Sequence, residues 1–328
     1  MKHLEQKLVL ITGGASGIGK IMALLMLERN AKVIIWDIDQ SKIDDTLSEF
    51  KSKGAVFGFM VDVSNIKQIQ ENAKKIKGEF GAVDVLINNA GIIVGKYFHE
   101  HSTADVVKTM EINANAPMLI TKEFLEDMLK RNSGHICNIA SSGGLISNPK
   151  MSVYVASKWS VIGWSDSLRI ELKQMNKNID ITTVMPYYIN TGMFDGVRSK
   201  IPILNPEEVA LNIIKAIEKN KKMLTIPGYI YRLTRFGQAI MPINIFDWFT
   251  GSVMGIYKTM HRLRVRFFWP TLRGDVRNWV RNCAHCIAAN QWRKNREELY
   301  FSWPITIPFW IIHIDIWYPG STKDANGN

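Results

Sequence analysis

The feature that most constrains the fold of this chain is a glycine-rich turn near its N-terminus, Thr12-Gly13-Gly14-Ala15-Ser16-Gly17-Ile18-Gly19. The residues before it, Lys7 to Ile11, form an apolar run typical of a short buried strand, and a helical pattern continues to about Asn30. Glycines let backbone N–H groups approach a ligand closely, and a helix N-terminus favours negative charge. This order predicts a site for the pyrophosphate of a dinucleotide. The residues expected to contact it are Gly13, Ser16, Gly17, Ile18 and Gly19.

A carboxylate at the end of the next apolar strand indicates which dinucleotide binds. The strand covers Ala31 to Trp36, and Asp37 follows it about twenty residues beyond the turn. A carboxylate in this place accepts hydrogen bonds from the adenosine ribose hydroxyls and repels a 2′-phosphate. Neither Ser16 nor Ile38 supplies the positive charge that would hold such a phosphate. The sequence therefore favours NAD over NADP.

Three polar residues in the middle of the chain form a proton-transfer group. Tyr154 and Lys158 are four residues apart, and Ser141 lies thirteen residues before Tyr154, at the end of an apolar run. On a helix the i and i+4 side chains share one face, so the Lys158 ammonium can favour the ionised form of the Tyr154 phenol. A phenol with a pKa of ~10 in water then becomes a usable acid or base. The alternative for this spacing alone is a surface helix that carries an unrelated Tyr and Lys.

These motifs, in this order, resemble the short-chain dehydrogenase/reductase family over roughly residues 5–260. Further markers occur at the family's spacing: Asp62 in Val-Asp-Val-Ser, Asn88-Asn89-Ala90-Gly91, Asn113, and Pro186 through Thr191-Gly192. The resemblance implies that Asp62 touches the adenine amine and that Asn89 braces the central strand beside the cofactor. It implies that Asn113 holds a water that relays protons to Lys158, and that Thr191 bonds the nicotinamide carboxamide. Gly91, Pro186 and Ile189 complete the expected cofactor contacts.

Two positions depart from the family pattern. Tyr187 stands where the family usually has glycine after the proline, which could alter the wall near the nicotinamide. Ala140 stands where serine is common beside the catalytic serine, and we expect this change to be silent.

The pattern of elements and the chain length define the expected architecture. Strand and helix patterns alternate through about residue 225, which predicts an α/β fold with a doubly wound parallel sheet, the Rossmann fold. The chain has 328 residues, of which 46% are hydrophobic, so it exceeds one ordinary domain and has enough apolar side chains for a sizeable core. We expect the dehydrogenase-like domain to cover residues 1–260 and a small appendage to cover residues 261–328.

The stretch Thr191-Gly192-Met193-Phe194-Asp195-Gly196 narrows the resemblance to the branch that includes retinol and 17-beta-hydroxysteroid dehydrogenases. The segment Gly255 to Met260 is also similar to that branch. An apolar lid over the site would suit a lipophilic alcohol. The alternative is that the same residues pack into the core beneath a loop. The residues concerned are Met193, Phe194, Ile201, Ile203 and Leu204.

Composition and pattern also bear on the compartment and on partners. Met1 to Lys7 is polar, which argues against a signal peptide, and the chain has no run of ~20 apolar residues. Three cysteines, with Cys137 in a strand, favour a reducing compartment, and we expect a cytoplasmic protein. The aromatic, mildly basic stretch from Tyr229 to Met254 either lies at a membrane interface or forms the family's C-terminal helices. The resemblance implies a homo-oligomer built through the long helices, including the one that bears Tyr154.

The last fifth of the chain differs in character. Residues 261–328 hold ten Lys or Arg and five Asp or Glu, so they supply five of the eleven net positive charges. The order Phe267-Phe268-Trp269-Pro270, Asp275 to Val280 and Cys283-Ala284-His285-Cys286 resembles a retrotransposon integrase zinc-binding domain. Ile311 to Asp315 resembles the first strand of the integrase's RNase H-like core.

Ligand chemistry argues against a working integrase. A closed zinc site needs four ligands, and Cys283 and Cys286 provide two, while the histidine pair expected upstream is missing. A two-metal nuclease needs several carboxylates, and of these the sequence supplies only Asp315, at the position of the first metal-binding carboxylate of the integrase core. We expect no functional metal site, and a tail that is a fragment of such a domain.

These observations leave three alternative functions from different classes. The first is an NAD-dependent alcohol dehydrogenase in which Tyr154 takes the hydroxyl proton, Ser141 orients the oxygen, and Lys158 binds the ribose and lowers the pKa of Tyr154. The second is a nucleic-acid-binding protein that acts through the basic, aromatic tail. The third is a non-catalytic interaction protein, which the intact Ser141, Tyr154 and Lys158 disfavour.

Overall fold

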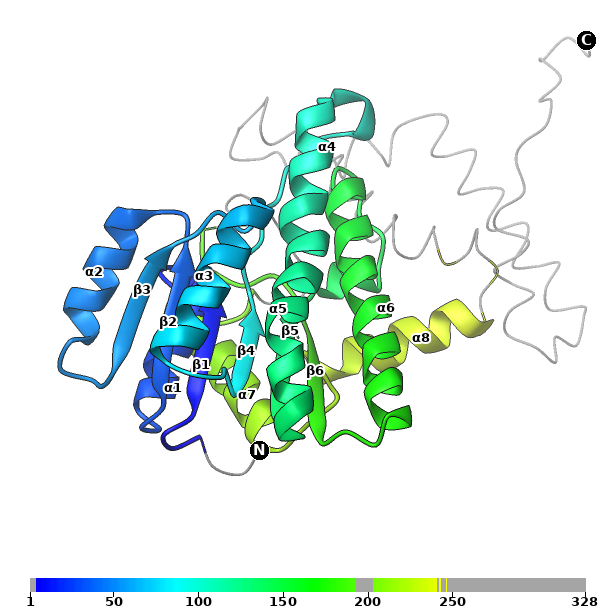
Figure 1. Cartoon of the computed structure of the whole chain (residues 1–328). Helices are drawn as coiled ribbons and strands as arrows, with labels where there is room; N and C mark the ends of the chain where they lie inside the picture. The colour runs from blue at the N-terminus through cyan, green and yellow to red at the C-terminus, as the bar shows by residue number, and fades with distance from the viewer. Residues whose placement is uncertain (1–3, 193–202, 241, 243–245, 247–328) are drawn as a thin grey trace, which may run out of the picture. The chain divides into compact units, whose positions relative to one another are not determined.

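The computed structural model describes residues 4–192, 203–240, 242 and 246. Met193, Phe194 and Ile201 of the expected lid lie outside these residues, and so does the whole of segment 261–328 with Cys283 and Cys286. The described chain alternates strands with helices (Figure 1). The strands are β1 (Leu8–Thr12), β2 (Lys32–Asp37), β3 (Val56–Met60), β4 (Val85–Asn88), β5 (Gly134–Ile139), β6 (Ile179–Pro186) and β7 (Met223–Ile226). The α-helices are α1 (Gly17–Leu27), α2 (Gln40–Phe50), α3 (Ile66–Glu79), α4 (Thr103–Met110), α5 (Ala116–Arg131), α6 (Ser152–Gln174), α7 (Pro206–Glu218) and α8 (Gly228–Ile240).

Three short helical turns complete the described elements. The 3-10 turns η1 (Phe98–Glu100) and η3 (Ser142–Gly144) follow strands β4 and β5, and the π-helical turn η2 (Glu111–Asn115) joins α4 to α5. The strands predicted from the sequence at residues 7–11 and 31–36 are each displaced by one residue in the structure.

The seven strands form one parallel sheet in the order β3-β2-β1-β4-β5-β6-β7. The chain runs outward from β1 to β3, then crosses back to β4 on the other side of β1 and runs outward again. This arrangement confirms the predicted doubly wound α/β fold. In such sheets the ligand site lies beyond the carboxyl ends of the strands, at the point where the strand order reverses. That point here lies between β1 and β4.

The apolar core lies on both faces of the sheet because successive strand residues point to opposite sides. In β1, Val9 and Ile11 pack on one face and Leu8 and Leu10 on the other. Each large side chain that is fully buried in this way contributes about 1.5–3 kcal/mol.

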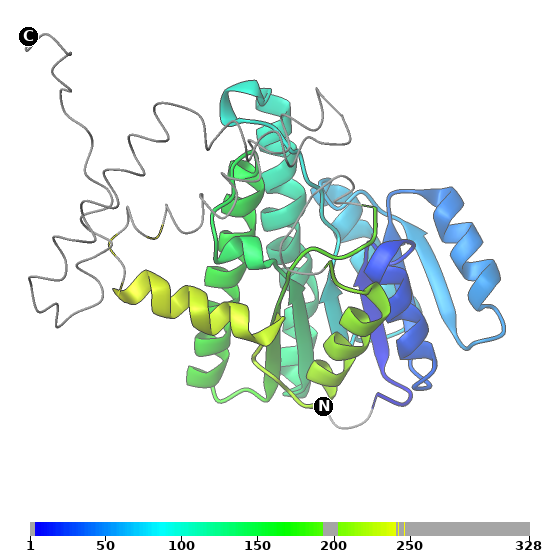
Figure 2. The same ribbon diagram turned by 180° about the vertical axis from the view of Figure 1, so that it is seen from behind.

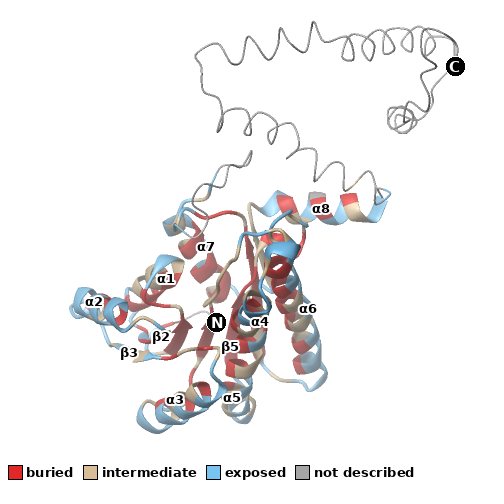
Figure 3. Ribbon diagram, turned by 90° about the horizontal axis from the view of Figure 1, so that it is seen from above, coloured by how far each residue is buried: buried red, intermediate tan, exposed pale blue. Residues whose placement is uncertain are grey.

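Helices cover both faces of the sheet. Helices α1 and α7 pack on the first face, and α3, α5 and α6 on the second, as Figures 1 and 2 show from opposite sides. Their buried residues face the sheet, and their outer faces are exposed (Figure 3). Trp36 of β2 and Phe124 of α5 are both fully buried, and their ring centroids are 6.0 Å apart. Cys137, in β5, is fully buried as expected, and burial raises the pKa of its thiol.

Helix α8 packs beside the end of the sheet through one face. Ile230 and Thr234 are buried, and Gln238 Nε2 donates a hydrogen bond of 2.9 Å to the carbonyl oxygen of Leu145. Its other face exposes aromatic and basic side chains. None of the helices that the structure describes combines the length and the hydrophobicity needed to cross a bilayer.

Candidate active site

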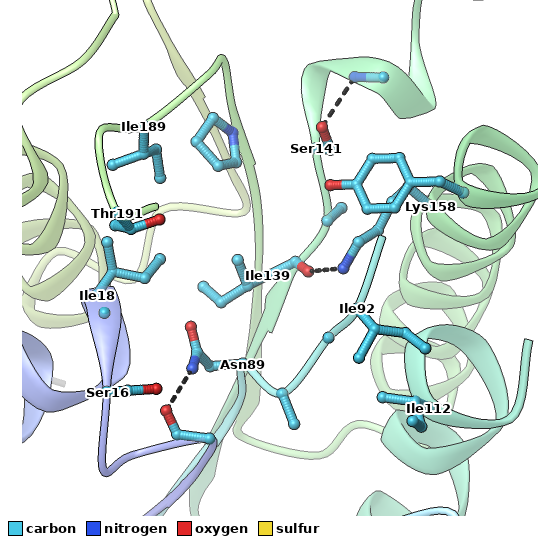
Figure 4. Close-up of a pocket in the computed structure, with 18 of the residues that line it drawn as sticks. Ser16, Ile18, Asn89, Ile92, Ile112, Ile139, Ser141, Lys158, Ile189 and Thr191 are labelled. Atoms are coloured by element: carbon cyan, nitrogen blue, oxygen red, sulfur yellow. Dashed lines mark hydrogen bonds between the residues drawn. The ribbon is translucent and has the colours of Figure 1, made fainter. Parts of the chain in front are cut away.

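A cavity of about 540 Å³ opens at the carboxyl ends of the strands, where the strand order reverses. It is lined by the glycine-rich turn after β1, the ends of β2, β4, β5 and β6, and the first turns of α6. Its volume lies in the range of small-molecule and cofactor sites. Figure 4 shows Ser16, Ile18 and Asn89 on one side of it and Ser141 and Lys158 on the other.

The glycine-rich turn passes very close to its own helix. Gly13 has φ +63°, a left-handed conformation that favours glycine. A Cβ at Gly19 would collide with the carbonyl oxygen of Gly13, so only glycine fits at that position. Asn89, which follows β4, donates through Nδ2 to the carbonyl oxygens of Thr12 at 2.9 Å and Gly13 at 3.0 Å. The turn is therefore held in shape from the neighbouring strand.

Helix α1 begins at this turn without a side-chain cap. Ser16 makes no capping hydrogen bond, and the first turn of α1 carries no acidic residue. By contrast, helices α2, α3, α4 and α7 are capped at their N-termini by side chains of Asp39, Asn65, Ser102 and Asn205. The first N–H groups of a helix need acceptors, and together they favour an anion. The start of α1 therefore fits a pyrophosphate group.

Two carboxylates line the cavity, Asp37 at the end of β2 and Asp62 shortly after β3. Asp37 Oδ2 accepts a hydrogen bond of 3.0 Å from the backbone N–H of Ala15, which ties it to the glycine-rich turn. Asp62 Oδ1 accepts from the hydroxyl of Ser64 at 2.6 Å and from its backbone N–H at 2.9 Å. Both carboxylates are therefore fixed in position at the cavity wall.

Ser141, Tyr154 and Lys158 meet on the opposite wall. Ser141 follows β5, and its Oγ accepts a hydrogen bond of 3.0 Å from the backbone N–H of Gly143. Tyr154 and Lys158 lie one turn apart on α6, and Lys158 Nζ is 5.8 Å from the centroid of the Tyr154 ring. Lys158 Nζ also donates a hydrogen bond of 2.9 Å to the carbonyl oxygen of Ile139 (Figure 4). The surface-helix alternative is wrong, because Tyr154 is 6% exposed and Lys158 is 5% exposed.

Burial is the largest influence on the pKa values of Tyr154 and Lys158. Burial raises the pKa of Tyr154, and its side-chain hydrogen bond with Ser141 offsets only part of this effect. Burial also lowers the pKa of Lys158 to about 8. Removal of the phenol from water therefore opposes its ionisation more strongly than Ser141 favours it, and the lowering of the Tyr154 pKa by Lys158 stays a prediction.

Asn113 stands behind the cavity wall in the π-helical turn η2. Its Oδ1 accepts from the backbone N–H of Ile92 at 2.8 Å, and its Nδ2 donates to the Ile92 carbonyl oxygen at 2.8 Å and to Ser157 Oγ at 3.2 Å. The ideal Cβ position of Gly91 is 3.3 Å from Asn113 Oδ1 and 3.5 Å from Lys158 Nζ, so Gly91 lies between the two side chains. A π-helical turn inside a helix is frequent at functional sites.

The cavity collects most of the residues that the sequence singled out. Asn113 and Gly19 do not line it, and both support residues that do. The expected residues on its wall are Gly13, Ser16, Gly17, Ile18, Asp37, Asp62, Asn89, Gly91, Ser141, Tyr154, Lys158, Pro186, Ile189 and Thr191. Ile203 and Leu204 of the expected lid do not line it: Ile203 is exposed, and Leu204 packs against the core.

Sequence reasoning missed several lining residues. Lys42, Lys108, Met151 and Tyr188 also line the cavity, and Tyr188 contacts Met151. Tyr188 could have been predicted from the sequence, because it directly follows Tyr187 in the segment that was already expected to form the cavity wall. Nothing comparable distinguished Met151, whose position depends on how the chain enters α6.

Two features line one cavity. One is the uncapped start of α1 after the glycine-rich turn, and the other is the group formed by Ser141, Tyr154 and Lys158. Together they are typical of a nicotinamide-dependent oxidoreductase. Residues 7–202 match the family model described as short chain dehydrogenase, and the chain belongs to this family. Estradiol 17-beta-dehydrogenase 11 of Macaca fascicularis is 36% identical over 236 residues, covering 71% of this chain and 79% of that protein. Epidermal retinol dehydrogenase 2 of Mus musculus is 35% identical over 250 residues, covering 74% and 81%.

Solved structures agree with this family. A short chain dehydrogenase/reductase from Burkholderia phymatum, in complex with NAD, has a TM-score of 0.67 and 26% identity, and the match covers 72% of this chain and 94% of that one. The protein is therefore an oxidoreductase that interconverts alcohols and carbonyls with a nicotinamide cofactor.

The C-terminal part of the chain matches a second family model. Residues 247–292 match the integrase zinc binding domain, which confirms the resemblance seen around Cys283 and Cys286. The match begins before residue 261, where we expected the appendage to start, and that boundary stays a prediction. In the part of the chain that the structure describes, no three His, Cys, Asp or Glu side chains form a group that could hold a metal ion. Nucleic-acid binding by the tail also stays a prediction, and loss of DNA binding with added salt would test it.

Proposed function

We propose that this protein is an NAD-dependent dehydrogenase of lipophilic alcohols. The observation that carries the proposal is that Ser141 and Lys158 lie across one cavity from the glycine-rich turn (Figure 4), and that Tyr154 lines the same cavity. The names of two relatives, an estradiol dehydrogenase and a retinol dehydrogenase, both refer to lipophilic alcohols. The cavity wall beside Tyr154 supports the same substrate class, because Met151, Pro186 and Tyr188 present largely apolar surface there.

Each residue of the Ser-Tyr-Lys group has a separate role in this proposal. Nicotinamide, when bound, accepts the hydride from the alcohol carbon. Tyr154 accepts the hydroxyl proton as its phenolate, and Ser141 Oγ donates a hydrogen bond that orients the substrate oxygen. Lys158 holds the ribose and stabilises the phenolate by its charge, while Asn113 holds a water on the proton path behind it. In the reverse direction Tyr154 returns the proton to the carbonyl oxygen.

We propose NAD rather than NADP because of the charges at the adenosine end. Asp37 places a carboxylate at the ribose position, and Ile38 beside it is apolar. Lys42 also lines the cavity, and its Nζ forms a salt bridge of 3.1 Å with Asp39. This pairing, together with Asp37, makes the end of β2 a poor place for a 2′-phosphate.

We further propose a cytoplasmic homo-oligomer that associates peripherally with membranes. Helix α6 exposes Trp159 and Ile170, which supports an interface through the long helices. Helix α8 exposes Tyr229, Phe236 and Ile240 next to two arginines, a composition that suits a headgroup region. Sedimentation of the full chain tests the first statement and flotation with liposomes tests the second. A monomer, or a protein that stays wholly in the soluble fraction, would reject the respective statement.

Substitution of the proposed proton acceptor tests the enzymatic function. Tyr154→Phe removes only the hydroxyl, so we expect turnover of alcohols to fall by at least about 1,000-fold. NADH should still bind, because the cofactor cradle is intact, and fluorescence titration measures this. Tyr229→Phe makes the same change on the exposed face of α8 and should leave turnover unchanged. Normal turnover in Tyr154→Phe would reject the mechanism.

A further inference from the structure

Ser157 is a buried serine of α6 to which the proposed mechanism gives no role. It follows Tyr154 by three residues and directly precedes Lys158, and its side chain is 0% exposed. Its Oγ donates a hydrogen bond of 2.7 Å to the backbone carbonyl oxygen of Tyr154 and accepts one of 3.2 Å from Asn113 Nδ2. The hydroxyl therefore joins α6 to the π-helical turn η2.

The orientation of the Asn113 amide depends on this hydroxyl. An amide nitrogen has two N–H donors, and in Asn113 one donates to the carbonyl oxygen of Ile92 and the other to Ser157 Oγ. Asn113 is 1% exposed, so a loss of the Ser157 hydroxyl would leave one of these buried N–H groups without an acceptor. A buried donor without a partner is unfavourable, and the amide would have to move to find another.

The place of the amide matters because it lies beside Lys158. The ideal Cβ position of Gly91 is 3.3 Å from Asn113 Oδ1 and 3.5 Å from Lys158 Nζ, so both atoms lie against the same glycine. Ser157 thus holds the Asn113 side chain and the Tyr154 backbone with one hydroxyl, and the next residue along α6 is Lys158. A shift of the Asn113 amide changes the space next to the ammonium.

An alternative is that Ser157 serves only the stability of the helix, because serines within helices often bond a carbonyl oxygen of the preceding turn. Helix α6 contains a serine of this kind for comparison. Ser165 is also 0% exposed, and its Oγ donates to the carbonyl oxygen of Val161 at 2.6 Å and accepts from Asn138 Nδ2 at 2.9 Å. The two serines have the same kinds of hydrogen bond, but the amide that Ser165 holds belongs to β5 and not to η2.

We propose that Ser157 is a positioning residue whose hydroxyl holds the Asn113 amide in the orientation that the proton path behind Lys158 requires. This inference rests on the proposed function, in which Asn113 holds a water on that path. Ser157 acts through Asn113 alone and contacts neither the substrate nor the cofactor.

A double-mutant cycle with the full-length protein, NAD and estradiol or cyclododecanol tests this role. Ser157→Ala removes Oγ alone, and we expect kcat/KM for oxidation to fall by about tenfold because the amide is displaced. NADH affinity should stay within about twofold of the wild type, since the cofactor cradle is unchanged. In an Asn113→Ala background the same change should alter kcat/KM by less than about twofold, because the amide that Ser157 positions is gone.

The solvent isotope effect reports on the proton path itself. When proton release slows, it limits turnover more strongly, so the ratio of kcat in H2O to kcat in D2O should increase by about 1.5-fold or more in Ser157→Ala. Ser165→Ala is the matched control, because it loses the same two kinds of hydrogen bond. It should lower the melting temperature to a similar extent and leave both kcat/KM and the isotope ratio at the wild-type values.

A second variant fills the space that alanine leaves empty. Ser157→Cys has nearly the same shape, but its thiol is a much weaker donor and acceptor than a hydroxyl. It should fold like the wild type and show the same loss of kcat/KM and the same rise of the isotope ratio as Ser157→Ala. Wild-type values in folded Ser157→Cys would contradict the role of the hydroxyl.

The outcomes separate this inference from the proposed function. Absence of NADH formation in the wild type would reject the function, and the role of Ser157 with it. Normal turnover in Asn113→Ala would reject the proton path. If both proteins behave as expected, an equal loss from Ser157→Ala with and without Asn113 would overturn the role of Ser157 alone. An equal loss in Ser165→Ala would also overturn it, since any buried hydroxyl of α6 would then have the same effect.

Discussion

The Lys158 ammonium lies 5.8 Å from the centre of the ring of Tyr154, which precedes it by one turn of α6. The ammonium also donates a hydrogen bond of 2.9 Å to the carbonyl oxygen of Ile139. This contact places the amine between β5 and α6. Burial acts on both groups in opposite senses, since it raises the pKa of Tyr154 and lowers that of Lys158. The group therefore rests with a protonated phenol at neutral pH.

The pH dependence of the two reaction directions should follow from this. Because the pKa of Tyr154 is raised, the phenolate that accepts a proton is scarce at pH 7 and grows up to tenfold per pH unit. We expect kcat/KM for alcohol oxidation, measured at saturating NAD, to rise from pH 7 to about 8 and to rise less steeply above that, where Lys158 loses the charge that stabilises the phenolate. Carbonyl reduction, which uses the phenol as the acid, should stay level up to about pH 8. An oxidation profile that is flat from pH 7 upward would contradict the assignment.

The contact between Gly19 and Gly13 should make the cofactor site intolerant of one methyl group. In Gly19→Ala the new Cβ collides with the Gly13 carbonyl oxygen, so the turn must move. We expect NADH affinity to fall by at least about tenfold, equivalent to about 1.4 kcal/mol. In Gly78→Ala, on α3, the new Cβ meets no atom within 4 Å. This variant should bind NADH with normal affinity, and its free energy of unfolding should increase by about 0.5–1 kcal/mol. Fluorescence titration and thermal melting compare the two, and equal affinities would show that the turn does not hold the cofactor.

The charge of Asp37 should decide the choice of cofactor. Asp37→Asn keeps an oxygen that accepts from Ala15 N–H but removes the negative charge. We expect the ratio of kcat/KM for NADP to that for NAD to rise by about tenfold or more. Asp45→Asn, the same change at an exposed site on α2, should leave the ratio unchanged. An unaltered ratio in Asp37→Asn would remove the basis for proposing NAD.

A buried histidine far from the cavity should limit stability in acid. His135 in β5 is fully buried with Nε2 2.8 Å from Thr182 Oγ1, and burial lowers its pKa to about 3. The unfolded chain binds this proton below pH 6.5, whereas the folded chain binds it only near pH 3. The free energy of unfolding therefore falls as pH drops through this window, by about 2 kcal/mol at pH 5.

A neutral side chain at position 135 isolates this contribution. His135→Gln should show a weaker loss of stability between pH 6.5 and 4 in urea unfolding, although it is less stable than the wild type at pH 7. His99→Gln at an exposed site should retain the wild-type slope. The same slope in all three proteins would exclude His135 as the cause.

The sequence was most informative where function is local. The turn from Gly13 to Gly19 and the spacing of Tyr154 and Lys158 depend on neighbours in the chain, and the apolar run before the turn predicted a short buried strand, which is β1. These features were enough to predict the fold and most of the cavity wall.

Features that depend on tertiary packing could not be predicted in the same way. The pKa of Tyr154 depends on how deeply α6 packs, and the Tyr188–Met151 contact joins residues 37 positions apart in the chain. The π-helical turn at Asn113 has no periodic signal, because it is one local widening within a longer helical pattern. Lys42 and Lys108 reach the cavity only because their helices flank it.

Transfer of a deuterium label tests the central claim most directly. Purified full-length protein is incubated with NAD and a secondary alcohol that carries deuterium on the reacting carbon, such as labelled estradiol, cyclododecanol or its diol. The mass of the reduced cofactor is then measured. We predict NADH that carries one deuterium with the wild type and none above background with Tyr154→Phe. Reduced cofactor without the label, or equal labelling in the two proteins, would contradict hydride transfer at a site where Tyr154 moves the proton.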